Sequence, residues 1–197
     1  MKPRWSAILL AGGASSRMGR PKPLLEYRGE TFLDRQIALF HSAGGRVVCV
    51  LGHDAARIGA SLRRADEAVL VLNPRPERGQ LSSLQCGLRA LCPDTEAFFF
   101  TPADSPGVRP ETLNALLDAF DPAAADFWQP SVRGTHGHPV LAPARMAAAL
   151  LALPPLASAR DLLRASRRRF VETDDEAAIL DIDTPEAFRR LTGEELP

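Results

Sequence analysis

Neither sign of charge is in surplus in this sequence, and no stretch of it stays apolar for long. Its 24 basic and 24 acidic side chains give a formal net charge of zero. A nucleic acid duplex or an anionic membrane surface favours a basic surplus, so we expect neither as a main partner. The five-residue apolar run near the N-terminus is too short for a signal peptide, and no run approaches the ~20 residues that cross a bilayer.

Cysteine is also scarce. Cys49, Cys86 and Cys92 are odd in number, lack C-x-x-C spacing and lie in apolar stretches. These features predict buried thiols in a reduced, cytoplasmic protein.

Lysine is the rarest charged residue. Only two of the 24 basic residues, Lys2 and Lys22, are lysines. Because this chain uses arginine wherever a general positive charge suffices, the lysine inside a glycine-rich segment is a candidate for a specific contact.

Apolar runs and helical patterns alternate along the first 121 residues. Strands are predicted at residues 6–10, 46–51, 68–72 and 97–101, and helices at residues 31–43, 53–64, 81–91 and 110–120. This alternation of continuously apolar strands and helices is typical of a parallel sheet covered on both faces, a three-layer α/β/α class.

The pattern is less regular after residue 121. It predicts strands at residues 126–132, 138–141, 170–172 and 178–181, and helices at residues 144–153, 160–166 and 185–191. We find no internal repeat, and 197 residues suit one domain. We therefore expect a single domain, residues 1–197, with a soft boundary between 1–121 and 122–197 and one shared sheet.

Four polar or glycine-rich segments follow predicted strands. They are residues 11–22, 73–83, 102–107 and 181–184. Ligands of an open parallel sheet bind beyond the carboxyl ends of its strands, so these segments are expected to meet at one site.

The segment LLAGGASSRMGRPKPLL, residues 9–25, joins a glycine turn to cations. Backbone N–H groups of such a turn can point together at an anion, and Arg17 and Lys22 can reach a polyphosphate from it. Neither G-x-x-x-x-G-K-S/T nor G-x-G-x-x-G occurs here. On the residues alone, the segment is either a phosphate-binding loop or a mobile turn whose cations are solvated.

The later segments also have two interpretations each. Asp104 is either a Mg²⁺ ligand or a turn residue that bonds its own backbone. Asp183 either pairs with Asp181 on one side of a strand or precedes a helix that Thr184 caps and Pro185 begins.

Serines and histidines raise the same question in two other segments. Ser82 and Ser83 open a helix, where a capping role is the commoner one. His136 and His138 have no cysteine or carboxylate neighbour in the sequence, which argues against a metal pair.

The stretch LAGGASSRMGRPKPLL resembles the signature L-A-G/A-G-x-S-x-R-M-G-x-x-K-x-L-L of nucleotidyltransferases that act on molybdopterin. The resemblance implies a mostly parallel, Rossmann-like sheet of the nucleotide-diphospho-sugar transferase type. It implies a nucleotide-binding half at residues 1–121 and an acceptor-side half at residues 122–197. It also implies that the nucleotide is bound by Leu10, Ala11, Gly12, Gly13, Arg17 and Lys22.

Three further motifs extend the resemblance. The stretch FFFTPADSPGV is similar to a GDQP-like motif, and the stretch DIDTPEAF is similar to D-I/V-D-T-P-E-D. These similarities imply Mg²⁺ ligands at Asp104 and Asp183. Ala187 stands where the last aspartate of the second motif is usual. NPRPERGQLSSLQCGL is similar to N…GM-x-x-S-L…GL, which implies a lid over the nucleoside that contains Asn73, Gly79 and Ser82. RGTHGHPVL resembles the G-x-x-G-H-P-V of cytidylyltransferases, which implies that His138 lies on the acceptor side.

The implied reaction is a Mg²⁺-dependent transfer of a nucleoside monophosphate from a triphosphate to molybdopterin or another phosphorylated acceptor, with release of pyrophosphate. Arg17, Lys22 and Asp104 are the expected catalytic residues. An ionised phosphate nucleophile needs no general base, which agrees with the lack of a G-x-S-x-G motif. A transient contact with a molybdenum enzyme or its chaperone is implied too.

The nucleotide is less clearly specified. LAGG favours the GTP-using branch, whereas GHPV and DIDTPE favour the CTP-using branch, and we expect CTP. The alternatives are a GTP-using guanylyltransferase, a sugar-phosphate nucleotidyltransferase and, in another class, a non-catalytic nucleotide-binding chaperone for a cofactor.

Overall fold

A computed structural model describes residues 2–14 and 20–193 of the chain. One eight-stranded sheet has the order β10-β7-β9-β6-β1-β4-β5, with β8 paired to β7. Its strands are β1 (Trp5–Ala11), β4 (Arg46–Leu51), β5 (Ala68–Leu72), β6 (Ala97–Pro102), β7 (Phe127–Val132), β8 (Thr135–His136), β9 (Val140–Pro143) and β10 (Arg168–Glu172). A separate hairpin joins β2 (Glu26–Tyr27) to β3 (Glu30–Thr31).

The helices connect these strands. They are α1 (Phe32–Ser42), α2 (Ala55–Ser61), α3 (Gln80–Arg89), α4 (Pro110–Asp118), α5 (Met146–Leu151), α6 (Ala159–Ala165) and α7 (Pro185–Thr192). The described part of the chain also has the short 3₁₀ turns η1 (Lys22–Leu24), η2 (Ala65–Glu67), η3 (Pro76–Arg78) and η4 (Glu176–Ile179).

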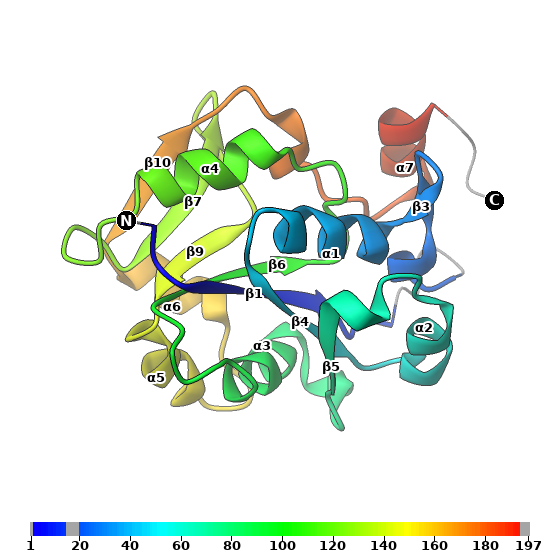
Figure 1. The fold of residues 1–197 in the computed structure, drawn as a ribbon, viewed down its shortest axis with the longest axis horizontal. Helices are drawn as coiled ribbons and strands as arrows, with labels where there is room; N and C mark the ends of the chain where they lie inside the picture. The colour runs from blue at the N-terminus through cyan, green and yellow to red at the C-terminus, as the bar shows by residue number, and fades with distance from the viewer. Residues whose placement is uncertain (1, 15–19, 194–197) are drawn as a thin grey trace.

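Helices pack on both faces of the sheet. Helices α1 and α4 lie over one face, and α3, α5 and α6 lie over the other (Figure 1). The central strand β1 is buried along its whole length. Because successive side chains of a strand point to opposite faces, Leu9 joins the core under α1 and Ile8 joins the core under α3.

Aromatic side chains fill the first of these cores. The ring of Trp5 meets the rings of Phe99 and Phe40 edge-on, with centroids 5.2 and 6.3 Å apart. Truncating a fully buried phenylalanine such as Phe99 to alanine typically costs about 3–5 kcal/mol of folding free energy. The aromatic cluster therefore holds α1 against β1 and β6, the two strands whose ends carry the site.

The strand and helix pattern of the first 121 residues is confirmed, including the parallel pairing of β1 with β4 and β6 and of β4 with β5. Strands from both sides of residue 121 belong to the one sheet. In the second half, β9 runs antiparallel to both of its neighbours. The hairpin β2–β3 and the short strand β8 have no counterpart in the sequence-based prediction.

Three expectations were wrong. Residues 176–179 form the 3₁₀ turn η4 rather than contributing to a strand at 178–181, because the backbone there bonds within its own turn, with the N–H of Ala178 donating to the carbonyl oxygen of Asp175 over 3.0 Å. Strand β5 is not covered on both faces, since it lies at the edge of the sheet. Among the thiols only Cys49 is buried; Cys86 is half-buried and Cys92 is exposed because it lies in the loop after α3.

Within the described residues, no helix has the length and apolar character needed to cross a membrane.

Candidate functional site

The four strand-end segments predicted to meet do converge on one cavity. It has a volume of about 310 Å³ and opens at the carboxyl ends of β1 and β6. Its walls are formed by Leu10, Ala11, Gly12, Gly13, Lys22, Pro23, Pro76, Gly79, Gln80, Ser83, Pro102, Ala103, Asp104 and Asp183. The connections from β1 and β6 leave in opposite directions across the sheet, so the cavity occupies the switch point where open α/β sheets bind ligands.

Backbone hydrogen bonds fix the floor of this cavity. The N–H of Ala103 donates to the carbonyl oxygen of Leu10 over 3.1 Å, which continues the β1–β6 pairing beyond the strands. The N–H of Ile182 donates to the carbonyl oxygen of Asp104 over 3.1 Å. This second bond brings the segment before α7 to the end of β6, although the two are far apart in sequence.

A buried amide on α1 supports the loop after β6. The Nε2 of Gln36 donates to the carbonyl oxygens of Pro102 and Ser105 over 3.0 and 3.1 Å. Gln36 is itself almost fully buried. Because Gln36 is buried and hydrogen-bonded, its side chain has little freedom to move. It therefore holds the loop that carries Asp104 in one conformation before any ligand binds.

A small apolar cluster anchors the other charged residues. Leu25, Phe32, Ile182 and Phe188 pack together, with the rings of Phe32 and Phe188 stacked at 6.1 Å. Leu25 directly follows η1, which begins at Lys22, and Ile182 directly precedes Asp183. The cluster therefore sets the separation of the lysine and the aspartate, which come from opposite ends of the sequence.

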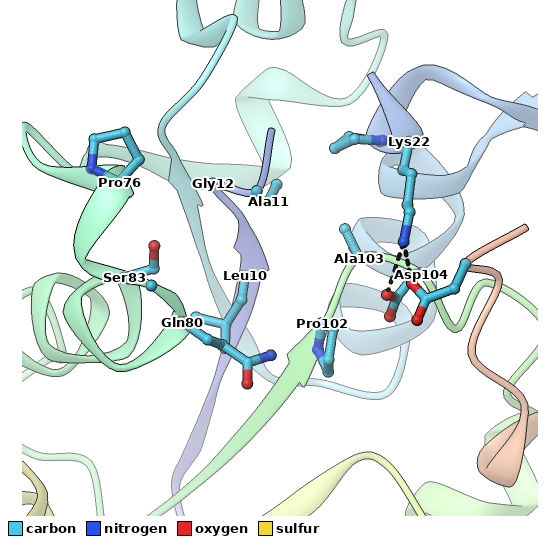
Figure 2. Close-up of a pocket in the computed structure, with 14 residues that line it drawn as sticks. Leu10, Ala11, Gly12, Lys22, Pro76, Gln80, Ser83, Pro102, Ala103 and Asp104 are labelled. Atoms are coloured by element: carbon cyan, nitrogen blue, oxygen red, sulfur yellow. Dashed lines mark hydrogen bonds and ion pairs between the residues drawn. The ribbon is translucent and has the colours of Figure 1, made fainter. Parts of the chain in front are cut away.

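Lys22 contacts both aspartates of the site. Its Nζ lies 3.5 Å from Oδ2 of Asp104 and donates a shorter hydrogen bond to Oδ1 of Asp183. Figure 2 shows the lysine side chain reaching from η1 to the two carboxylates, with Ser83, Gln80 and Pro76 on the opposite wall. The side chains of Lys22 and Asp104 are only 16% and 19% exposed, so this contact is poorly screened by solvent.

Asp104 is the most perturbed carboxyl of the cavity. Burial raises its pKa from 3.8 to about 6, the nearby charge of Lys22 opposes the rise, and the charges of Asp181 and Asp183 add to it. Its Oδ1 is buried and has no hydrogen-bond partner among the described residues. A buried carboxylate oxygen without a partner is costly, and a cation would satisfy it.

The donor set suits a hard cation. Asp104 and Asp183 together offer carboxylate oxygens at one wall of the cavity, and Mg²⁺ is commonly held by one or two protein carboxylates while its other ligands are water and phosphate. No group of three or more metal-ligating side chains occurs within residues 2–14 and 20–193, so a dedicated protein cage is not present there.

The glycine turn after β1 forms a second wall. A Cβ on Gly12 would lie 2.7 Å from Oγ of Ser83, whereas a Cβ on Gly13 would meet no atom within 4 Å. Gly12 thus lets the turn approach α3, and Gly13 leaves open space at the cavity surface. Leu10 and Ala11 contribute the end of β1 to the same wall.

The third wall is the loop from β5 into α3. Asn73 is buried, and its Nδ2 donates to Oγ of Ser82 and of Ser83 over 2.8 and 3.0 Å. Gly79 has a φ of +84°, a conformation that favours glycine, and the helix begins at Gln80. Asn73 therefore does not line the cavity but holds the loop that does.

Three cavity residues on this wall, Pro76, Gln80 and Ser83, were not among the predicted site residues. Gln80 and Ser83 line the cavity, whereas Ser82 is not part of its wall and its hydroxyl donates to the carbonyl oxygens of Gly79 and Arg75. Gln80 and Ser83 are three apart and so share a helix face, but the sequence carries no signal that separates Ser83 from Ser82.

His138 lies outside the cavity wall. Its backbone N–H donates to the carbonyl oxygen of Ala178 over 2.8 Å, and its Nδ1 is buried without a partner among the described residues. Burial lowers the pKa of its imidazole, although the charge of Asp181 and a hydrogen bond to the Phe100 backbone act in the other direction. Arg17, the other expected phosphate contact, lies outside the described residues.

Comparisons with known proteins show which family and which structures the chain is similar to. Residues 7–172 match the family described as the MobA-like NTP transferase domain. The chain is 27% identical over 181 residues to the molybdenum cofactor cytidylyltransferase of Escherichia coli, covering 92% of each chain. It is 31% identical over 113 residues to the molybdenum cofactor guanylyltransferase of Xanthomonas euvesicatoria, covering 57% of this chain and 53% of the relative. The crystal structure of Rv0371c from Mycobacterium tuberculosis superimposes with a TM-score of 0.82 at 25% identity, over 98% of this chain and 100% of the other.

Proposed function

Because the chain belongs to the family of MobA-like NTP transferase domains, we propose that it transfers CMP from CTP to the terminal phosphate of molybdopterin or the molybdenum cofactor. The chain is a nucleotidyltransferase enzyme, given the family match over residues 7–172 and the similarity to a cytidylyltransferase along 92% of its length. Beyond the family, we propose the identity of the nucleotide, of the acceptor and of the metal.

One observation carries it. A glycine turn, a lysine and two aspartates from distant parts of the sequence line the same cavity, where β1 and β6 end. A triphosphate needs N–H donors and cations, and a reaction at phosphorus needs charge neutralisation. The lining residues supply both within about 310 Å³.

Asp104 and Asp183 would hold the Mg²⁺ ion. The buried, unpartnered Oδ1 of Asp104 is the atom that a cation fits best. When bound, Mg²⁺ supplies charge neutralisation of the phosphate oxygens. Lys22 bonds both carboxylates, so in the proposed complex its ammonium group turns from them toward the phosphates.

The transfer itself requires little from the protein beyond positioning. An oxygen of the acceptor phosphate forms a bond to the α-phosphorus, and the bond from that phosphorus to the bridging oxygen of the β-phosphate breaks, so pyrophosphate leaves with the electron pair. The acceptor phosphate is already ionised near neutral pH and loses no proton. Lys22 stabilises the charge that develops on the leaving group, and Arg17 is the second residue proposed for this role.

One comparison favours CTP and the molybdenum cofactor. A curated relative that is similar along nearly its whole length is a cytidylyltransferase, whereas the similarity to the Xanthomonas euvesicatoria guanylyltransferase covers about half of each chain. The histidine of the GHPV segment, His138, is proposed to face the acceptor side, where it neighbours Asp181. Delivery of the product to a molybdenum enzyme or its chaperone, in the cytoplasm, belongs to the same proposal.

Pyrophosphate release tests the proposal directly. The purified chain would be incubated with molybdopterin and each of CTP, GTP, ATP and UTP, with Mg²⁺ or with EDTA. We expect release with CTP and Mg²⁺ only. Release with GTP alone would replace the cytidylyltransferase by a guanylyltransferase, and release only with a sugar phosphate as acceptor would remove molybdopterin.

An aspartate pair supplies the matched control. Asp104→Ala is expected to lower kcat by at least about 100-fold, because it removes the unpartnered cavity oxygen. Asp181→Ala removes an equal charge close by but outside the cavity wall, and it should retain most of the activity. A chain that releases no pyrophosphate with any acceptor, yet binds a nucleotide, would be a chaperone rather than an enzyme.

A further inference from the structure

Strand β5 is an open edge of the sheet. Among the described strands it pairs only with β4. The N–H of Asn73 donates to the carbonyl oxygen of Leu51 over 2.8 Å. The backbone groups of Asn73, and of Val71 two residues before it, therefore point toward β4. Backbone groups alternate in direction along a strand, so those of Leu70 and Leu72 point away from the sheet. The edge therefore presents unpaired donors and acceptors.

The side chains of this edge are apolar and exposed. Val69, Leu70 and Leu72 are 58%, 39% and 63% exposed, and all five residues of the strand, AVLVL, are apolar. Natural proteins usually protect an edge strand with charged side chains. The opposite edge has this protection, since Arg168 and Arg169 of β10 are exposed, whereas β5 has none.

The sequence of β5 suits a second copy of itself. An antiparallel pair with a two-fold axis at Leu70 sets Leu70 opposite Leu70, Ala68 opposite Leu72 and Val69 opposite Val71. Every cross-strand pair is then apolar on both faces of the sheet. The outward backbone groups of Leu70 also meet their counterparts in the hydrogen-bonded type of antiparallel pair.

Charges at the two ends of the strand fit the same arrangement. Asp66 precedes β5 and Arg75 follows it, and both are exposed. Asp66 lies in η2 just before β5, so the antiparallel pair brings the Asp66 end of one strand to the Arg75 end of the other. The two-fold symmetry repeats this attraction at the other end, whereas a parallel pair would set like charges together.

We propose that the chain forms a symmetric dimer in which β5 of each copy pairs antiparallel, joining the two sheets into one. The pairing goes beyond the proposed reaction and does not depend on it. Because β5 leads into the loop with Pro76 and Gly79, the interface begins beside one wall of each cavity. The carboxyl ends of the paired strands point in opposite directions, so the two cavities open on opposite sides of the dimer.

The mass in solution tests the proposal. Sedimentation equilibrium over about 1–200 µM should show wild-type protein approaching twice the 21.3 kDa mass of one chain. Leu72→Lys should remain at 21.3 kDa throughout with an unchanged circular dichroism spectrum, because its side chain contacts little within its own chain. Leu156→Lys is the matched control: this leucine is 95% exposed, lies outside β5, and should leave the dimer intact. A wild-type monomer at every concentration, or a dimer that survives Leu72→Lys, would overturn the proposal.

Cross-linking tests the register independently of that variant. Cα atoms of a hydrogen-bonded antiparallel pair are about 5.5 Å apart, within the range that a disulfide spans. Leu70→Cys, in a background with Cys86 and Cys92 changed to serine, should therefore oxidise to a covalent dimer. Leu156→Cys in the same background should not. Failure of Leu70→Cys to cross-link, in a protein that is folded, would exclude a two-fold axis at this residue.

Discussion

Replacing Asp104 by asparagine should make the protein more stable at neutral pH while removing its activity. Burial raises the pKa of this carboxyl from 3.8 to about 6, so the folded state favours the protonated form. The charged form consequently costs folding free energy that is absent at low pH and appears as the pH rises between these two values. Asparagine has nearly the same shape and never carries the charge.

The magnitude follows from the pKa difference. A shift from 3.8 to about 6 corresponds to about 3 kcal/mol at pH 7.5, where the carboxyl is ionised in both the folded and unfolded chains. At pH 4 the folded carboxyl is protonated and the unfolded one only partly ionised, which leaves less than about 1 kcal/mol. Urea unfolding of wild type and Asp104→Asn at both pH values, in EDTA to remove metal ions, measures the two differences.

A neighbouring carboxylate provides the control. Asp181 is exposed, so Asp181→Asn should change the unfolding free energy by less than about 0.5 kcal/mol at either pH. Two results would refute the reasoning: an Asp104→Asn protein less stable than wild type at pH 7.5, or a stability gain that is the same at pH 4. The first would mean that Lys22 compensates fully for the burial of this charge, and the second that the gain does not arise from ionisation of Asp104.

Three other predictions concern the glycine turn, the buried imidazole and the thiols. Gly13→Ala should weaken nucleotide binding about tenfold by calorimetry without lowering stability. Gly12→Ala should also lower the free energy of unfolding by about 1–3 kcal/mol, because its Cβ would lie 2.7 Å from a serine oxygen on α3. Equal stability of the two variants would contradict this. Because burial lowers the pKa of His138 from 6.5, its C2–H signal in NMR should titrate below pH 6.5. The folded state should lose stability as the pH falls through 6.5, where the imidazole of the unfolded chain becomes protonated. A titration midpoint at or above pH 6.5 would contradict this. A thiol reagent should modify exposed Cys92 rapidly and Cys49 only on unfolding, since burial strongly raises the pKa of the latter; rapid loss of both thiols in native protein would count against the core packing.

Local patterns were sufficient for much of the fold. Strands β4 and β5 begin and end at the predicted residues, because continuous apolar runs between polar turns leave little choice of boundary. The start of α7 was also predicted from the sequence. Thr184 accepts a hydrogen bond from the N–H of Ala187, and Pro185 lies in the first turn. Structure was wrongly predicted where it depends on distant packing, as at the turn η4.

The candidate site divides in the same way. The glycine turn, Lys22, Asp104 and Asp183 were predicted because each follows a strand end or belongs to a motif, and all of them line the cavity. Motif position alone could not separate Ser82 from Ser83. The direction of a side chain in the first turn of a helix depends on how that helix lies against β1, which no local pattern records.

The sequence by itself determined that a glycine turn, a lysine and two aspartates follow strand ends, and these residues line the cavity. Only the tertiary structure decided that Lys22 bonds both aspartates and that Asp104 is buried enough to raise its pKa to about 6. It alone also decided that an apolar strand, β5, is an exposed edge. Strand order and burial arise from contacts between residues far apart in the chain, so neither can be read from the neighbours of a residue in the sequence.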